Sequence, residues 1–263
     1  PPLFSSRRRH TRSSVESRGL GDVYKRQASG VAIAASHEDI ADQIGGAVLF
    51  GGYCCLERTL GCMLTGEHEW EAESHQLHPD PYGRWVVASN YLTQVPGYED
   101  AVDVSDAARQ LATAASGKRV SAWEPYHDEM IRDLRTTIDA SRRELFDMIA
   151  TVTTDERPDR ERCAELAKAL SDTCRRLEPQ LDPVTSLDQV RVPTQVIHGR
   201  GDRLVPFTEG MRLMENLPED VRRGVTVTKM INHSKDHVPE NPMEHAYEAG
   251  MLFRALHQLV NTV

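Results

Sequence analysis

The C-terminal third of the chain holds a carboxylate and an imidazole that could work as a pair. Asp202 follows the apolar run Thr194–His198, and His233 follows a second run, Gly224–Met230. Both runs have the composition of strands, and Phe207–Leu217 between them has helical periodicity. Parallel strands joined by a helix end at the same edge of a sheet, so we expect Asp202 and His233 to be neighbours. A carboxylate beside an imidazole fixes its tautomer and stabilises its protonated form, as nucleophilic catalysis requires.

The residues around Asp202 form a recognisable pattern. The segment His198–Pro206, HGRGDRLVP, resembles the H-G-x-x-D-x-x-V-P signature of the α/β-hydrolase superfamily. The resemblance covers Ala28–Val263. In that family the Asp is the acid of a Ser, Asp, His triad, and His233 lies where the family places its histidine. The resemblance implies hydrolysis of an ester, thioester or amide through an acyl-enzyme, with no metal and no organic cofactor.

Each of these assignments has an alternative. An Asp after a strand often only forms a turn, and the complete signature favours the catalytic interpretation of Asp202. For the base, His237 is a second candidate because His237-Val238-Pro239 resembles the H-x-P that follows some hydrolase histidines. Counting from the strand start at Val225, the usual strand and turn end at His233, which we therefore favour.

The nucleophile is where the sequence departs from the family. The family serine lies in G-x-S-x-G, on a sharp turn from strand to helix, and the sequence contains no such motif. Aligning Ser29-Gly30 with the start of the helix that follows this turn places the nucleophile at position 27, which is Gln27. Ser29 is the local fallback, but it puts Val31 where the family has glycine. We expect that the original serine is missing and that the chain as written is inactive.

Three other functions stay open. An Asp nucleophile in the same fold would give an epoxide or haloalkane hydrolase. A protein that keeps the fold without a nucleophile would be a non-catalytic binding protein. Residues 56–185 could also form a helical interaction module that folds alone. The expected substrate is a small ester-type molecule of unknown identity.

The first 27 residues differ in character from the rest. Asp22–Gln27 back-translates to GATGTGTATAAGAGACAG, which resembles a transposon end used to fragment DNA for sequencing, and the Arg-rich Ser5–Arg12 resembles adaptor readthrough. A disordered tail or a basic arm is the alternative. We expect residues 1–27 to be a disordered artefact and the chain to be truncated on its N-terminal side, by an unknown number of residues.

The remaining pattern predicts an α/β fold, the C-terminal portion of a hydrolase-type parallel sheet with a large helical insertion. We assign residues 28–55 and 189–263 to the partial core, with strand Ala47–Phe50 among them, and 56–188 to a helical cap without a strand pair. The helices expected from periodicity and capping residues are Gly30–Ala41, Ser105–Ser116, Asp159–Leu177 and Met243–Val260, and Met130–Ile149 is expected to hold helical material as well. The last of these is expected to bury Leu252, Phe253, Leu256, Leu259 and Val260.

Composition limits the partners. The chain carries 31 Lys and Arg against 40 Asp and Glu, a net charge of −9, which repels phosphate backbones and anionic membranes. We expect no nucleic-acid partner and no membrane; the sequence does not indicate an oligomeric state. The five cysteines are Cys54, Cys55, Cys62, Cys163 and Cys174. An odd number with two adjacent is typical of a reduced, cytoplasmic protein.

Two weaker groups of residues complete the candidates. His68, His75 and His78 lie among Glu67, Glu69, Glu71 and Glu73, but their spacing matches no metal motif, and a solvated acidic loop is the preferred interpretation. Aromatic residues of the helical region could line an apolar ligand pocket, although ordinary packing is the stronger expectation for any one of them. They are Trp70, Tyr82, Trp85, Tyr91 and Trp123.

Overall fold

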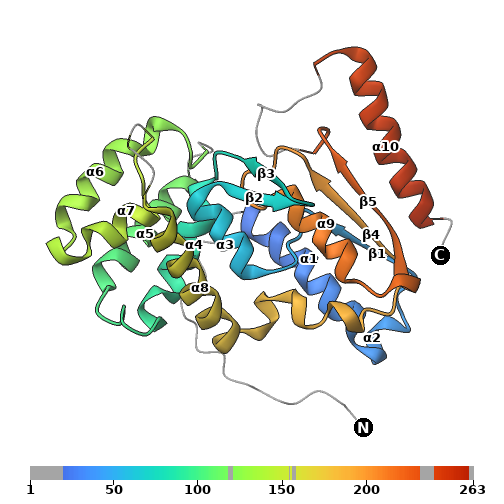
Figure 1. Cartoon of the computed structure of the whole chain (residues 1–263), viewed down its shortest axis with the longest axis horizontal. Coiled ribbons are helices and arrows are strands. Elements are labelled where there is room, and N and C mark those ends of the chain that lie inside the picture. The colour runs from blue at the N-terminus through green and yellow to red at the C-terminus, as the bar shows by residue number, and fades with distance from the viewer. Residues whose placement is uncertain (1–19, 118–120, 154, 156–157, 232–239, 261–263) are drawn as a thin grey trace, which may run out of the picture.

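A parallel sheet of three strands forms the centre of the α/β part. The computed structural model describes residues 20–117, 121–153, 155, 158–231 and 240–260 (Figure 1). Strand β4 (Thr194–Gly199) lies between β1 (Ala47–Phe50) and β5 (Arg222–Thr228), and all pairings are parallel. All six residues of β4 are buried, as a central strand covered on both faces requires. The predicted parallel arrangement of these three strands is confirmed.

Helices cover both faces of this sheet. Helices α1 (Leu20–Ser36) and α9 (Phe207–Asn216) pack on one face, and α10 (Pro242–Val260) lies on the other (Figure 1). The short helix α2 (Glu38–Ala41) connects α1 to β1. The apolar core under α1 and α9 includes Ala32, Leu49, Val196 and Leu213. Helix α1 begins at Leu20, so residues 20–27, expected to lie in a disordered segment, are helical backbone.

The orientation of α10 differs from the prediction. Phe253 and Val260 are 70% and 71% exposed, and Leu256 is exposed as well, whereas Glu248 and Ala255 are buried. Leu252 is half-buried, and the Leu259 side chain lies outside the described part of the chain. Glu248 accepts hydrogen bonds from Thr228 Oγ1 at 2.7 Å and from Lys229 N at 3.0 Å. These bonds at the end of β5 turn the Glu248 face of the helix inward, so the apolar face points outward.

The region between β1 and β4 is mainly helical. It contains α3 (Leu56–Thr65), α4 (Pro81–Tyr91), α5 (Val102–Gly117), α6 (Asp128–Thr137), α7 (Arg143–Ile149) and α8 (Arg160–Leu177). Their side chains form a second apolar core around Trp85, Leu111, Phe146 and Leu166, separate from the core under the sheet. Short 3-10 helices complete this part and its surroundings: η1 (Leu92–Gln94), η2 (Pro125–His127), η3 (Ala140–Arg142), η4 (Pro179–Leu181), η5 (Pro183–Thr185), η6 (Leu187–Gln189) and η7 (Glu219–Val221). The predicted helices Ser105–Ser116 and Asp159–Leu177 agree with α5 and α8. The helical material predicted over Met130–Ile149 is divided between α6, η3 and α7.

A strand pair that the sequence pattern does not predict lies in the same region. Strands β2 (Glu67–Trp70) and β3 (Glu73–Gln76) form an antiparallel hairpin. Its turn uses Glu71 and Ala72 at φ values of 47° and 67°, where glycine or asparagine is usual. The hairpin packs against α9, at the edge of the sheet where β4 ends.

Candidate active site

Asp202 lies in a tight loop directly after β4, and its carboxylate is fixed by that loop. The residue is buried, and Oδ1 accepts the backbone N–H groups of Leu204 at 2.9 Å and Val205 at 3.0 Å. Its own N–H donates to the carbonyl of Gly199 at 3.2 Å. Two backbone donors on one oxygen hold the carboxylate in a single orientation. The position at the carboxyl edge of the sheet is the one the sequence predicts.

His198 supports this loop from inside the sheet. Its ring is fully buried, and Nε2 lies 3.0 Å from the carbonyl oxygen of Val205. Since a carbonyl only accepts, Nε2 carries the hydrogen. The same nitrogen lies 3.8 Å from Asp202 Oδ2, which is too long for a hydrogen bond. His198, the first residue of the signature, therefore holds the far end of the loop 200–206, which carries Asp202 and is called the acid loop below.

The two candidate bases follow β5. Residues 232–239, which include His233 and His237, lie outside the described residues. The preceding strand ends beside the acid loop, because Thr228 pairs with Gly199 and its carbonyl accepts the N–H of Arg200 at 2.9 Å. The end of β5 and the start of the Asp202 loop are therefore hydrogen-bonded to each other.

Ser29 lies inside α1 and not on a turn between a strand and a helix. It is buried, and its hydroxyl has no hydrogen-bond partner within the described part of the chain. Its neighbour Ala28 packs against the loop after β1, where a Cβ on Gly52 would come within 2.7 Å of Ala28 Cβ. The backbone of residue 27 belongs to the same helix, and its side chain is outside the described part. Ser29 thus lacks the exposed position that a nucleophile on a sharp turn has.

Two buried carboxylates that sequence reasoning missed hold the start of α3. Glu209 Oε2 accepts the N–H groups of Cys54 at 3.0 Å and Cys55 at 2.8 Å, and its Oε1 accepts Arg58 Nε at 2.8 Å. Asp182 Oδ1 accepts the N–H of Leu56 at 3.0 Å. Negative groups at a helix N-terminus satisfy its orphan donors and complement its dipole. These residues position the loop after β1 and carry no sequence motif that would have revealed them.

Asp80 connects the helical region to the acid loop. Its N–H donates to the carbonyl of Arg203 at 2.8 Å, and its Oδ1 accepts the N–H of Tyr82 at 2.9 Å as the N-cap of α4. Burial raises the pKa of Asp80 to about 6, and the negative charge of Asp202 also raises it. The carboxyl that caps α4 is thus close enough to Asp202 for their charges to interact.

The histidines of the β2–β3 hairpin stack on each other and do not form a metal site. His68 and His75 have ring centroids 5.1 Å apart, both contact Phe207, and His68 Nδ1 lies 3.1 Å from Thr208 Oγ1. Burial lowers the pKa of His68 to about 4, and His75 adds to the effect. Among the described residues, no group of three His, Cys, Asp or Glu side chains could hold a metal ion.

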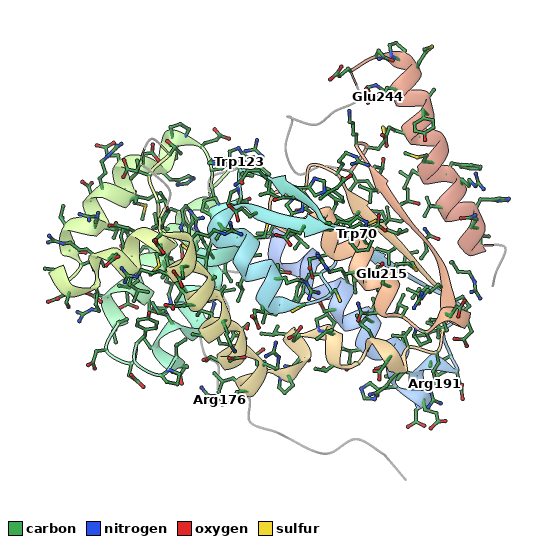
Figure 2. All side chains as sticks on the ribbon, viewed as in Figure 1. Trp70, Trp123, Arg176, Arg191, Glu215 and Glu244 are labelled. Carbon is green, nitrogen blue, oxygen red and sulfur yellow. The ribbon has the colours of Figure 1, made fainter. Side chains whose placement is uncertain are left out.

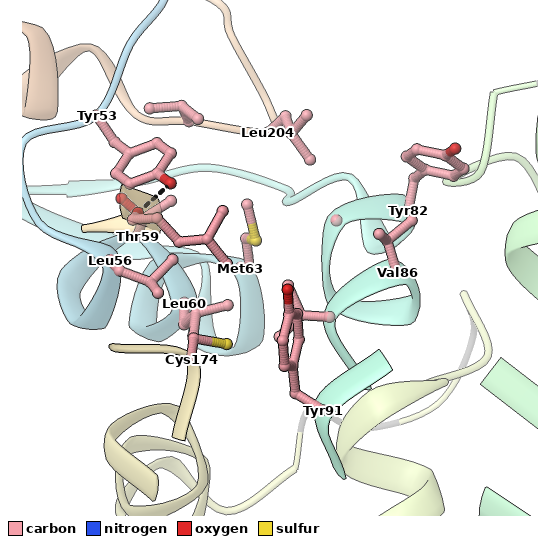
Figure 3. A pocket seen from close by; sticks show the side chains of 14 residues that line it. Tyr53, Leu56, Thr59, Leu60, Met63, Tyr82, Val86, Tyr91, Cys174 and Leu204 are labelled. Atoms are coloured by element: carbon pink, nitrogen blue, oxygen red, sulfur yellow. Dashed lines mark hydrogen bonds between the residues drawn. The ribbon is translucent and has the colours of Figure 1, made fainter. Parts of the chain in front are cut away.

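The aromatic candidates have different environments. Tyr82 and Tyr91 line an apolar cavity of about 80 Å³ between α3 and α4 (Figure 3). Trp85 is fully buried in the helical core and donates to the carbonyl of Ile149 at 3.0 Å. The guanidinium of Arg203 lies over the Trp123 ring, and Trp70 ends the β2 strand (Figure 2). Of the five, the two tyrosines line this cavity.

Some solved structures match this chain. No family model matches the sequence, and no curated protein matches it. An acetylester hydrolase from Corynebacterium glutamicum is 13% identical over 89% of this chain and 58% of its own, with a TM-score of 0.33. A tannin acyl hydrolase in complex with ethyl gallate is 15% identical over 87% of this chain and 63% of its own, with a TM-score of 0.26. Both are ester hydrolases, and the chain spans less than two thirds of the length of either.

Two further properties concern the chain as a whole. In the described part of the chain, no helix combines the length and the apolar character needed to cross a membrane. None of the five cysteines, all of which lie in the described part of the chain, forms a disulfide, and four of them are buried. Burial raises the pKa of Cys54 to about 12, so this thiol stays protonated and unreactive at neutral pH.

Proposed function

We propose that this protein is a hydrolase of ester or related acyl bonds, in which Asp202 is the acid and His233 the base of a catalytic triad. The observation that supports the proposal best is the geometry of Asp202. A buried carboxylate, anchored by two backbone N–H groups, follows the central strand of a parallel sheet next to the end of β5. The carboxyl edge of such a sheet is where ligands bind in open α/β folds.

The proposed chemistry needs no cofactor. A nucleophilic hydroxyl attacks the acyl carbon, and His233 accepts its proton and later donates it to the leaving group. Asp202 orients the imidazole and stabilises the imidazolium while it carries that proton. The rigid loop around Asp202 suits this role, because a carboxylate that stays in place loses no energy to reorganisation during the reaction.

The chain does not carry a nucleophile in the family's motif. No serine of the chain lies in G-x-S-x-G, and Ser29 is buried within α1. We therefore propose that the chain as written is inactive, since loss of the nucleophile of a triad costs several orders of magnitude in rate. A binding protein of the same fold, or an enzyme with an Asp nucleophile, is the alternative that the experiments below separate.

The first experiment tests the acid and base without requiring turnover. Imidazole resonances of the full chain are followed by NMR over pH 4 to 9, and the His233→Gln and His237→Gln variants assign the two histidines. In Asp202→Asn we expect the titration midpoint of His233 to move to lower pH, because a neighbouring carboxylate favours the charged imidazole. The exposed Asp188→Asn is the matched control.

The outcomes have separate meanings. If the titration midpoint of His237 moves in Asp202→Asn and that of His233 does not, His237 is the base. No response of either histidine would contradict the acid and base pair and with it the proposed function.

A fluorophosphonate probe then tests the nucleophile. Mass spectrometry of the labelled full chain identifies any serine that reacts. Labelling that disappears in His233→Gln would support a serine hydrolase. An unlabelled chain that forms an epoxide adduct on an aspartate would indicate an Asp nucleophile. A chain inert to both reagents is expected where the nucleophile is missing, and the histidine titrations then separate a hydrolase without its serine from a non-catalytic protein.

A further inference from the structure

We propose that the cavity between α3 and α4 binds a short, uncharged alkyl chain of about three or four carbon atoms, the acyl side of the ester. This inference deepens the proposed function and rests on it. The cavity lies among Leu60 and Met63 of α3, Val86 and Tyr91 of α4, and Leu204 of the acid loop (Figure 3). The aromatic pattern allows for an apolar ligand pocket, but neither it nor the signature predicts the size of the cavity or the length of its occupant.

The chemistry of the walls excludes a charged occupant. Most of the lining is apolar. Its main polar groups are the hydroxyls of Tyr53, Thr59, Tyr82 and Tyr91, and hydrogen bonds to protein oxygens are described for three of them. Tyr53 donates to the carbonyl of Leu181, Thr59 to that of Cys55, and Tyr91 to Glu178 Oε1 at 2.8 Å. Among the described residues, the lining contains no Lys, Arg, His, Asp or Glu side chain. A charged group would be desolvated there without a counter-charge, so an apolar group is the favoured occupant.

The cavity is joined to Asp202 through one short segment. Leu204 and Val205 line it, and the backbone N–H groups of the same two residues donate to Asp202 Oδ1. The wall of the cavity and the proposed acid are therefore parts of one rigid loop. An alkyl chain in the cavity would lie next to the edge of the sheet where we place the reacting carbonyl.

Volume sets the length of the chain. Apolar cavities of roughly 150 Å³ hold benzene, so a cavity of about 80 Å³ corresponds to roughly three or four carbon atoms. Gly83 fixes the spacing of the walls, because a Cβ at this position would lie 2.5 Å from Leu204 Cδ1 and 2.9 Å from Met63 Cε. A side chain at position 83 would have to displace the ends of Leu204 and Met63, so glycine at this position preserves the present shape of the wall.

The experiment uses a ligand that cannot be hydrolysed and a reporter inside the cavity. The full chain is labelled with [methyl-13C]methionine and titrated with 2-butanone, 2-pentanone, 2-hexanone and 2-nonanone. Met63 is the reporter, and Met243, which is 82% exposed, is the internal reference. We expect a saturable shift of the Met63 signal, with affinity rising about fourfold per methylene up to 2-hexanone and not beyond.

Matched variants test the location. Val86→Phe fills the cavity and is expected to abolish the Met63 shift, whereas Val102→Phe, at a 54% exposed position of α5, is expected to keep it. Circular dichroism checks that both variants fold. If Val86→Phe does not fold, Leu60→Met, which changes the shape of the wall with little change in volume, must alter the order of affinities. No Met63 shift in the wild-type chain, an equal shift in a folded Val86→Phe, or affinity that keeps rising to 2-nonanone would overturn the proposal.

A second readout separates this inference from the proposed function. Ketone binding at Met63 together with unperturbed His233 and His237 titrations in Asp202→Asn would keep the cavity and reject the catalytic pair. A His233 or His237 titration that responds to Asp202→Asn, with no ketone binding at Met63, would keep the catalytic pair and reject the cavity as a binding site.

Discussion

The backbone N–H of Asp80 donates to the carbonyl oxygen of Arg203, 2.8 Å away, and so fastens the start of α4 to the loop that carries Asp202. Asp80 also caps α4 by accepting the N–H of Tyr82. One residue therefore sets both the beginning of a helix and its distance from the acid loop.

The Asp80→Asn variant is expected to change how stability depends on pH. The pKa of Asp80 is raised to about 6, so between roughly pH 4 and 6 the unfolded chain has released a proton that the folded chain still holds. The free energy of unfolding of the wild type therefore falls as pH rises through this window. The amide side chain of the variant retains the acceptor for Tyr82 N–H and removes this fall. At pH 7 we expect the variant to be more stable by on the order of 2 kcal/mol.

Urea unfolding at pH 4.5 and pH 7.5 measures this difference. The free energy of unfolding of the variant minus that of the wild type should be larger at pH 7.5 than at pH 4.5. A difference that stays constant between the two pH values would contradict the raised pKa.

Removing the Glu209 carboxylate is expected to cost about 2 to 4 kcal/mol of stability, because two backbone N–H groups at the start of α3, one of them buried, lose their acceptor. In Glu209→Ala the N–H groups of Cys54 and Cys55 and the Arg58 guanidinium lose an acceptor. Glu215→Ala, on the exposed side of the same helix (Figure 2), is the matched control and should change stability by less than about 1 kcal/mol. Similar losses in the two variants, measured by urea unfolding, would show that Glu209 does not anchor α3.

Two glycine substitutions in helices should have opposite effects. A Cβ on Gly210 of α9 would lie 2.7 Å from His198 Nδ1, whereas a Cβ on Gly250 of α10 meets nothing within 4 Å. Gly250→Ala should stabilise the protein by roughly 0.5 to 1 kcal/mol through helix propensity. Gly210→Ala should destabilise it by about 1 to 3 kcal/mol, because a packed core resists added volume. Thermal unfolding of both variants tests the pair, and a stabilised Gly210→Ala would mean that His198 moves freely.

Ser29→Ala addresses the fallback nucleophile. The Ser29 hydroxyl is buried with no hydrogen-bond partner in the described part of the chain, so removing it should raise the free energy of unfolding by about 1 kcal/mol. Hydrolysis of 4-nitrophenyl butyrate should stay unchanged, since we do not place Ser29 at the reacting atoms. A loss of hydrolysis that cannot be restored by Ser29→Cys, with normal folding, would instead make Ser29 the nucleophile.

What the sequence predicts well is local. The run Thr194–His198 predicts β4 to within one residue, because a central strand must be apolar on both faces. The position of Asp202 after β4 is predicted because its loop and both of its backbone N–H donors lie within the signature 198–206. The helix Asp159–Leu177 agrees with α8 because Asp159 accepts the N–H of Arg162 as a cap.

What the sequence does not predict depends on distant contacts. Glu209 gains its role only when α9 packs beside the loop after β1, 155 positions away from Cys54. The β2–β3 hairpin escapes prediction because its strands are rich in Glu and His and its turn lacks Gly and Asn. The exposed face of α10 is mispredicted because Glu248, a charged residue, is the one that faces the sheet.

Val205 belongs to the apolar core of the helical region and not to the core under the sheet. The acid loop therefore continues the chain from β4, in the core under the sheet, while its Val205 side chain packs in the core of the helical region. Hydrogen exchange of backbone amides shows which core a segment unfolds with, because each cooperative unit opens with its own free energy. We expect the Leu204 and Val205 amides, which are bonded to Asp202, to exchange with deuterium at the rate of the α3 and α4 helices. The amides of β4, only a few residues earlier, should exchange with the sheet.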